Sequence, residues 1–131
     1  MKEIVSVIIP SYGGGTMIER CVDSVLNQTY PYVEVIVVDD CSTDNTREVV
    51  KQYKNVKLIC NEENKGAGYT YNRGIDNATG DYIVRIDSDD YFSLDALEKL
   101  YEKASSEQLD LLLFCAQAFC DNNISTSQGY E

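Results

Sequence analysis

Residues 33–40, VEVIVVDD, are the stretch that best defines the fold of this chain. Residues 33–38 are almost continuously apolar and rich in valine, and Asp39 and Asp40 end the run. A strand with apolar side chains on both faces is typical of a parallel sheet that helices cover on both sides. We therefore predict a buried strand at residues 33–38, with Asp39 and Asp40 at its carboxyl end.

Short apolar runs and amphipathic stretches alternate on both sides of this strand. Further strands are predicted at residues 4–9, 56–59, 82–86 and 111–119. Helical spacing of apolar residues, with capping residues before it, predicts helices near residues 18–28, 43–53, 71–78 and 94–101. This alternation favours the α/β class: a doubly wound, mainly parallel sheet with helices on both faces and the strand order 3-2-1-4.

Length and composition agree with a single globular domain. The chain has 131 residues, of which 44% are hydrophobic and 25% are charged, so residues 1–131 are expected to form one domain, with a polar tail at residues 120–131. Eleven basic and 22 acidic residues give a net charge of −11, which argues against a nucleic-acid partner. If the ligand is itself anionic, a positive group must bridge the two.

The residue types that are missing exclude several kinds of chemistry. The chain has no histidine, which excludes Ser–His–Asp and Cys–His nucleophilic sites and histidine-rich zinc sites. Its five cysteines are odd in number and form no CxxC. Cys21 lies on the apolar stripe of a predicted helix, and Cys60 and Cys115 lie in or at the ends of apolar runs, so all three are expected to be buried, reduced thiols. No apolar run approaches the roughly 18 residues of a membrane span, and we expect a cytoplasmic protein.

The most unusual residues of the chain follow the predicted strands. Pro10 and Tyr12 follow the first strand, Asp39 and Asp40 the second, and residues 87–90, DSDD, the fourth. In a parallel sheet the carboxyl ends of the strands lie along one edge, and ligands bind there at the point where the strand order reverses. With the order 3-2-1-4, these three groups are expected to meet in one crevice.

Two of these aspartates have the spacing of a metal site. In an extended chain residues i and i+2 point to the same side, so Asp87 and Asp89 are expected to face the crevice while Ser88 and Asp90 face away. Paired carboxylates without histidine or thiolate favour Mg²⁺ or Mn²⁺, which would carry an anionic diphosphate. The alternative is that the acids cap the next helix, and for Asp90 we prefer that interpretation.

Four other side chains are candidates for contact with a nucleotide. Tyr12 could stack on a nucleobase or simply pack, and Asp39 or Asp40 could accept hydrogen bonds from the base or ribose. Lys65 and its neighbours could bind a phosphate or could only begin a helix. The glycine runs at residues 13–15 and 66–68 match neither a P-loop nor GxGxxG, which argues against ATPase and nicotinamide sites.

Several of these segments together resemble the family 2 glycosyltransferases. The segments are residues 5–12 (VSVIIPSY), 35–44 (VIVVDDCSTD) and 87–90 (DSDD), with residues 64–75 matching between them in order and spacing. The resemblance extends from residue 4 to about residue 117. It implies an inverting enzyme of the GT-A fold that transfers a sugar from a nucleotide-diphosphate sugar to an acceptor hydroxyl.

The resemblance also implies roles for individual residues. Pro10 and Tyr12 would line the nucleobase pocket, and Asp40 would recognise the base, commonly uracil. Asp87 would lie beside the ribose or sugar, and Asp89 would bind Mg²⁺ or Mn²⁺ on the diphosphate, where the metal stabilises the departing nucleoside diphosphate as a Lewis acid.

Three positions depart from the family pattern. Cys41 stands where glycine is usual after the paired aspartates, Gly13 stands where asparagine often follows Tyr12, and Tyr71 replaces a common arginine ahead of Asn72. These departures bear on individual donor contacts and not on the fold.

The resemblance further implies a second half. Members of the family carry their general base, an aspartate, in a later half that also binds the acceptor, and neither Asp110 nor Asp121 is a convincing substitute. We expect this chain to supply the donor-binding half of a longer enzyme whose acceptor is a glycan or a lipid. Association with the inner face of the cell membrane would then come only through further chain. The alternative is a non-catalytic nucleotide-binding or interaction module.

Overall fold

The computed structural model describes residues 2–117, 119–120 and 123–124. The chain divides into two units, Met1–Tyr101 and Glu102–Glu131. The first unit contains the main sheet and the residues that the sequence singled out around it.

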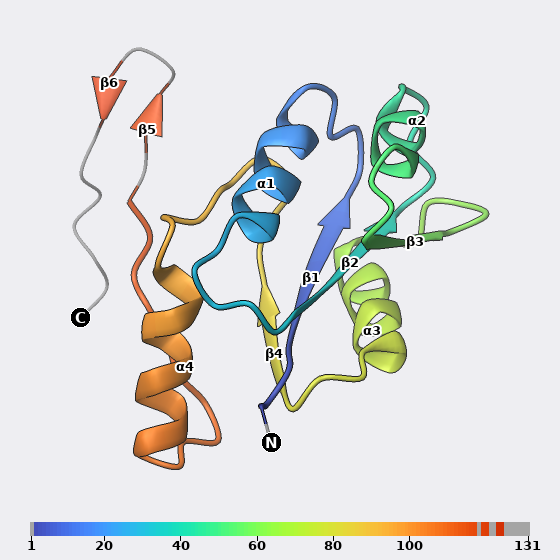
Figure 1. The fold of residues 1–131 in the computed structure, drawn as a ribbon. Helices are drawn as coiled ribbons and strands as arrows, with labels where there is room; N and C mark the ends of the chain where they lie inside the picture. The colour runs from blue at the N-terminus through green and yellow to red at the C-terminus, as the bar shows by residue number, and fades with distance from the viewer. Residues whose placement is uncertain (1, 118, 121–122, 125–131) are drawn as a thin grey trace. The chain divides into compact units, whose positions relative to one another are not determined.

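A four-stranded parallel sheet forms the centre of the first unit (Figure 1). Its strands are β1 (Val5–Ser11), β2 (Val33–Asp39), β3 (Val56–Cys60) and β4 (Tyr82–Arg85). Their order is β3-β2-β1-β4 and every pair is parallel, which confirms the predicted order. The strand order therefore reverses at β1, between the ends of β2 and β4.

Helices cover both faces of the sheet. They are α1 (Met17–Leu26), α2 (Thr46–Lys51), α3 (Ala67–Asn77) and α4 (Ala96–Ser106). One face of the sheet packs against α1, α2 and the first turns of α4 in a core whose fully buried side chains include Val7, Ile9, Val37, Ile18, Val22, Val50 and Leu97. The other face packs against α3. The predicted two-sided cover, which the unbroken apolar run of β2 required, is confirmed.

Gly74 allows α3 to approach the sheet closely. A Cβ atom at this position would lie 2.5 Å from Cγ2 of Ile8 and 3.2 Å from Cγ2 of Val38, two side chains that are fully buried. Any larger residue would push the helix away from β1 and β2. The position of α3, which carries one wall of the site described below, thus depends on this glycine.

The second unit does not contain the predicted fifth strand. Residues 111–117 adopt no regular structure, and the short strands β5 (Phe119–Cys120) and β6 (Asn123–Ile124) pair with each other. Leu111 and Leu113 are 75% and 83% exposed. An apolar run becomes a strand only where a neighbour accepts its backbone hydrogen bonds, and no described strand pairs with residues 111–117. The prediction of one strand over residues 111–119 was therefore wrong, since only Phe119, at its end, lies in a strand.

The cysteine predictions are confirmed in part. Cys21 is a free, buried thiol in α1, and burial, followed by the charges of nearby aspartates, raises its pKa to about 12. Cys60 is free and half-buried, whereas Cys115 is exposed, because the strand expected around it does not form. Of the predicted polar tail, residues 121–122 and 125–131 lie outside the described residues.

No helix in the described part of the chain is long and apolar enough to cross a membrane.

Candidate functional site

A hollow of about 500 Å³ lies at the carboxyl edge of the sheet. The segment at the end of β1, residues 10–14, forms one part of its wall, and Asp40 after β2 forms another. The first turn of α3 and residues 85 and 87–89 around the end of β4 complete it. The hollow therefore lies where the strand order reverses, as the sequence predicted.

The structure brings most of the predicted site residues together. Five of them line the hollow: Pro10, Tyr12, Asp40, Asp87 and Asp89. The two others, Asp39 and Lys65, are not part of its lining. The predicted meeting of the ends of β1, β2 and β4 is thus confirmed.

Asp40 is a buried carboxylate that accepts hydrogen bonds from the loop before α3. Its Oδ1 accepts from the backbone N of Lys65 at 2.7 Å and from Nδ2 of Asn61 at 2.9 Å, and its Oδ2 accepts from the backbone N of Gly66 at 2.9 Å. Burial by itself would raise the pKa of Asp40, but these hydrogen bonds outweigh burial and hold the pKa below its usual value. The carboxylate therefore stays ionised and fastens residues 61–66 beside the hollow.

Asp39 is fully buried and shapes the turn after β2. It accepts hydrogen bonds from the backbone N of Ser42 at 3.0 Å, from the Ser42 hydroxyl, and from Nε of Arg47 at 2.7 Å. These contacts connect the end of β2 to α2. Asp39 thus holds the turn from which Asp40 reaches the hollow.

Lys65 points its ammonium group at other residues. Its Nζ lies 2.6 Å from Oε1 of Glu63 and 5.7 Å from the centre of the Tyr69 ring. Its backbone N–H donates to Asp40, which does line the hollow, so Lys65 acts on the site through Asp40.

Cys41 adopts a backbone conformation that favours glycine. Its φ is +62°, in the left-handed region that costs residues with a Cβ atom about 1 kcal/mol or more. Ser42 donates two hydrogen bonds to Asp39 across this turn. The physical reason for the usual glycine is therefore visible, and Cys41 carries backbone strain directly beside Asp40.

Replacing Cys41 by glycine is expected to raise the free energy of unfolding by about 0.5–1 kcal/mol, since the strain disappears while glycine loses some chain entropy. Urea denaturation measures the change. Cys41→Ala is the matched control, because it removes the thiol but keeps the Cβ atom, and it is expected to give no gain. Equal stabilisation by both variants would assign the effect to the thiol and contradict the strain argument.

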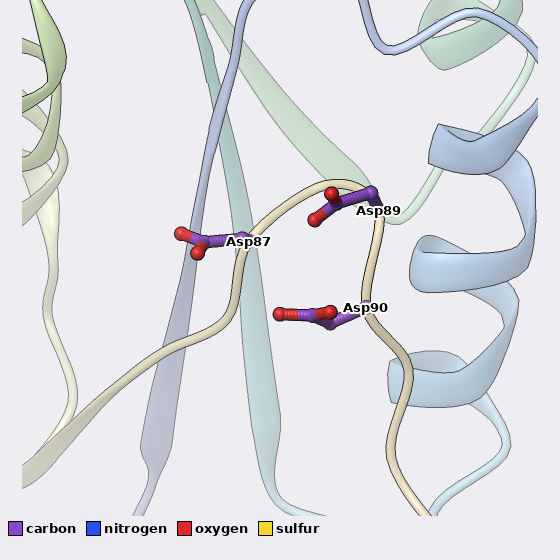
Figure 2. A group of neighbouring side chains, drawn as sticks. All are labelled: Asp87, Asp89 and Asp90. Carbon is purple, nitrogen blue, oxygen red and sulfur yellow. The ribbon is translucent and has the colours of Figure 1, made fainter. Parts of the chain in front are cut away.

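Asp87, Asp89 and Asp90 form a cluster of three carboxylates after β4. Each offers an oxygen, and these oxygens lie within 4.8 Å of one another; Figure 2 shows the three side chains around the same turn. The prediction that Ser88 and Asp90 face away was wrong: Ser88 lines the hollow, and the Asp90 carboxylate joins the cluster. The rule of alternating sides fails here because the chain forms a turn, in which the N–H of Asp90 donates to the carbonyl of Asp87 at 3.0 Å.

The crowded negative charge makes this cluster suitable for a divalent cation. Burial, and then the charges of Asp89 and Asp87, raise the pKa of Asp90 above its usual value. A hard cation such as Mg²⁺ or Mn²⁺ would relieve this repulsion and takes oxygen ligands of this kind. The residues present therefore fit the metal that the sequence suggested.

Ser11 and Arg85 are two polar side chains of the hollow that were not among the predicted site residues. Ser11 is buried, and its Oγ has no hydrogen-bond partner among the described residues, so a bound ligand could supply one. Arg85 lines the hollow from the end of β4. A charged residue inside the apolar run YIVRI at residues 82–86 was a usable signal for Arg85. The signal for Ser11 was its place between Pro10 and Tyr12 at the end of the first strand.

The known proteins that this chain is similar to include a family model and relatives that are all described as glycosyltransferases. The family described as Glycosyl transferase family 2 matches residues 6–131. The glycosyltransferase TuaG of Bacillus subtilis, named for teichuronic acid biosynthesis, is 45% identical over 134 residues, which cover 98% of this chain and 50% of TuaG. Glycosyltransferase GlyG of Streptococcus pneumoniae is 37% identical, over 86% of this chain and 39% of GlyG. The chain thus spans half or less of the length of these relatives.

Solved structures show the same fold. Staphylococcus aureus TarS 1–349 in complex with UDP-GlcNAc has a TM-score of 0.76 and 33% identity, over 80% of this chain and 32% of that chain. The mannosyltransferase PcManGT from Pyrobaculum calidifontis, in complex with GDP-Man and Mn²⁺, has a TM-score of 0.76 and 29% identity, over 80% of this chain and 33% of that chain.

Proposed function

Since the chain belongs to glycosyl transferase family 2, we propose that it binds a nucleotide-diphosphate sugar, with UDP as the nucleotide, for transfer of the sugar to an acceptor hydroxyl. The observation that carries this proposal is the shared hollow: Asp40 after β2, and Asp87 and Asp89 after β4, line the same cavity. A nucleotide sugar would fit this arrangement with its base beside Asp40 and its metal-bound diphosphate beside Asp87 and Asp89. The TarS complex with UDP-GlcNAc supports the choice of ligand.

The end of β1 and Asp40 form the proposed site for the base. Pro10 and Tyr12 line the hollow, and Tyr12 is 62% exposed, so its ring is available to stack on a base. The unpartnered Oγ of Ser11 offers a further hydrogen bond. Asp40 Oδ2 accepts one described hydrogen bond, so it has room to accept an N–H of the base. Asp39 enters the proposal as the residue that positions Asp40.

The acidic cluster is the proposed metal site. Asp89, with Asp87 and Asp90, would hold Mg²⁺ or Mn²⁺, and the PcManGT complex with Mn²⁺ supports a divalent ion. When bound, such an ion acts as a Lewis acid toward the leaving nucleoside diphosphate. The chain's own part is to orient the diphosphate between the ends of β1 and β4, so that the acceptor attacks the anomeric carbon in line and inverts it.

We assign the donor-binding half of the reaction to the described residues. The acceptor is a glycan or lipid hydroxyl, and the general base comes from outside the hollow described above. The test is calorimetric titration with UDP, UDP-GlcNAc and GDP-mannose in Mn²⁺ and in EDTA, followed by a transfer assay with a longer version of the protein. Metal-dependent binding of a UDP ligand supports the proposal, and a binder that never transfers sugar would be the non-catalytic module instead.

Replacing Tyr12 by alanine is expected to weaken UDP binding by about 1–3 kcal/mol, the usual contribution of an aromatic stack on a base. Tyr12→Phe keeps the ring and should bind like the wild type. Tyr69→Ala is the matched control, because Tyr69 is also exposed but does not line the hollow. Isothermal titration calorimetry with UDP measures all three. Unchanged affinity for Tyr12→Ala would make Tyr12 a packing residue.

A further inference from the structure

Arg85 is the one basic side chain among the described residues that line the hollow. The other charged side chains of the lining are Asp40, Asp87 and Asp89, and the chain as a whole has a net charge of −11. An anionic diphosphate is therefore repelled by the three carboxylates, and Arg85 is the lining side chain whose charge opposes this repulsion.

Two neighbours hold the Arg85 guanidinium in place at the end of β4. Its central carbon lies 5.1 Å from the centre of the Tyr71 ring of α3, so the group is supported from one side by an aromatic face. Its Nε and Nη2 lie 3.3 Å and 3.2 Å from Oδ1 of Asp87. The guanidinium is thus oriented beside the acidic cluster before any ligand arrives.

The hydrogen bonds to Asp87 use only part of the hydrogen-bonding capacity of Arg85. Both described hydrogen bonds end on a single oxygen of Asp87, and the Nη1 side of the fork is not engaged in them. Both partners are exposed, with side chains 43% and 56% accessible, and exposed ion pairs of this kind add little to stability. A role in holding the fold together therefore does not explain an arginine at this position, whereas the planar fork suits two oxygens of a phosphate.

We propose that Arg85 binds the diphosphate of the nucleotide sugar, an inference that rests on the proposed function of the hollow. Tyr71 positions the guanidinium, and Asp87 keeps the guanidinium near the acidic cluster. When the nucleotide sugar binds, its diphosphate replaces Asp87 as the partner of Arg85.

The test compares ligands with and without phosphates. Titration of Arg85→Gln at constant Mn²⁺ should show UDP affinity reduced by roughly tenfold to a hundredfold, the usual loss for a charge-assisted hydrogen-bonded contact. Uridine binding, followed by NMR titration, should stay within about twofold of the wild type, because the base site is untouched. The UDP affinity of Arg85→Lys should lie between those of the wild type and of Arg85→Gln. Lys57→Gln is the control, because it removes the same charge from an exposed position on β3 outside the hollow. It should leave the affinities for UDP and for uridine unchanged.

The outcomes separate this inference from the proposed function. Wild-type affinity of Arg85→Gln for UDP would overturn the inference and leave the function standing. Equal losses for UDP and uridine would also overturn it, since they would show a structural effect on the whole hollow. A wild-type chain that binds neither ligand would contradict the proposed function, and the inference with it.

Discussion

Asp89→Ala is expected to abolish metal-dependent binding of UDP while the domain stays folded. Asp89 is exposed, lines the hollow and shares the acidic cluster with Asp87 and Asp90. Changes to residues that merely support a metal ligand cost about 10- to 100-fold in affinity, so removal of a proposed ligand should cost at least about 100-fold. The loss should appear as UDP affinity in Mn²⁺ that falls to its value in EDTA.

Asp76→Ala is the control for this prediction. Asp76 is an exposed aspartate of α3 that does not line the hollow, so its replacement removes the same charge without touching the cluster. Thermal unfolding of both variants shows whether the fold is kept. If Asp89→Ala retains the full Mn²⁺-dependent affinity for UDP, the assignment of the metal to this cluster is wrong.

Asp40→Asn is expected to lower the free energy of unfolding by about 2–4 kcal/mol and to eliminate nucleotide binding. The Asp40 carboxylate accepts hydrogen bonds from three buried or half-buried N–H groups on residues 61–66. An asparagine presents its own N–H₂ group toward one or more of these donors, which leaves buried donors without acceptors. The loop before α3 then loses its attachment, and one wall of the hollow moves with it. Urea denaturation and UDP titration measure the two effects.

The same carboxylate predicts how wild-type stability depends on pH. The folded pKa of Asp40 lies below its unfolded value, so its contribution to stability is complete above about pH 4, near the unfolded pKa. It is lost as the pH falls through the folded pKa. Asp40→Asn should lack this part of the acid sensitivity, whereas the exposed control Asp76→Asn should keep it. An Asp40→Asn variant as stable as the wild type at pH 7 would contradict the role of Asp40 in holding the loop.

The strands and their order followed from simple patterns in the sequence. The run at residues 33–38 is apolar on both faces, so β2 could only be a buried strand, and the order β3-β2-β1-β4 confirmed this. The same kind of pattern failed at residues 111–117, where Leu111 and Leu113 are exposed and no described strand pairs with the run. Burial stabilises an apolar run, but the run forms a strand only if a neighbouring strand pairs with its backbone.

The site could be predicted as a set of segments, but not side chain by side chain. Asp39 and Asp40 are neighbours of the same residue type, yet Asp39 pairs with Arg47 and Asp40 lines the hollow. Asp90 joined the cluster because residues 87–90 form a turn, which periodicity cannot detect. Arg85 became a candidate only when the structure placed it in the hollow against Tyr71.

By itself, the sequence determined the class of fold, the strand order and the edge of the sheet that carries the site, because these depend on where apolar runs begin and end along the chain. The tertiary structure alone decided which acids meet, which one holds a loop and where a positive charge stands among them. These properties depend on turns and on contacts between residues that are far apart in sequence, and no local pattern records their geometry.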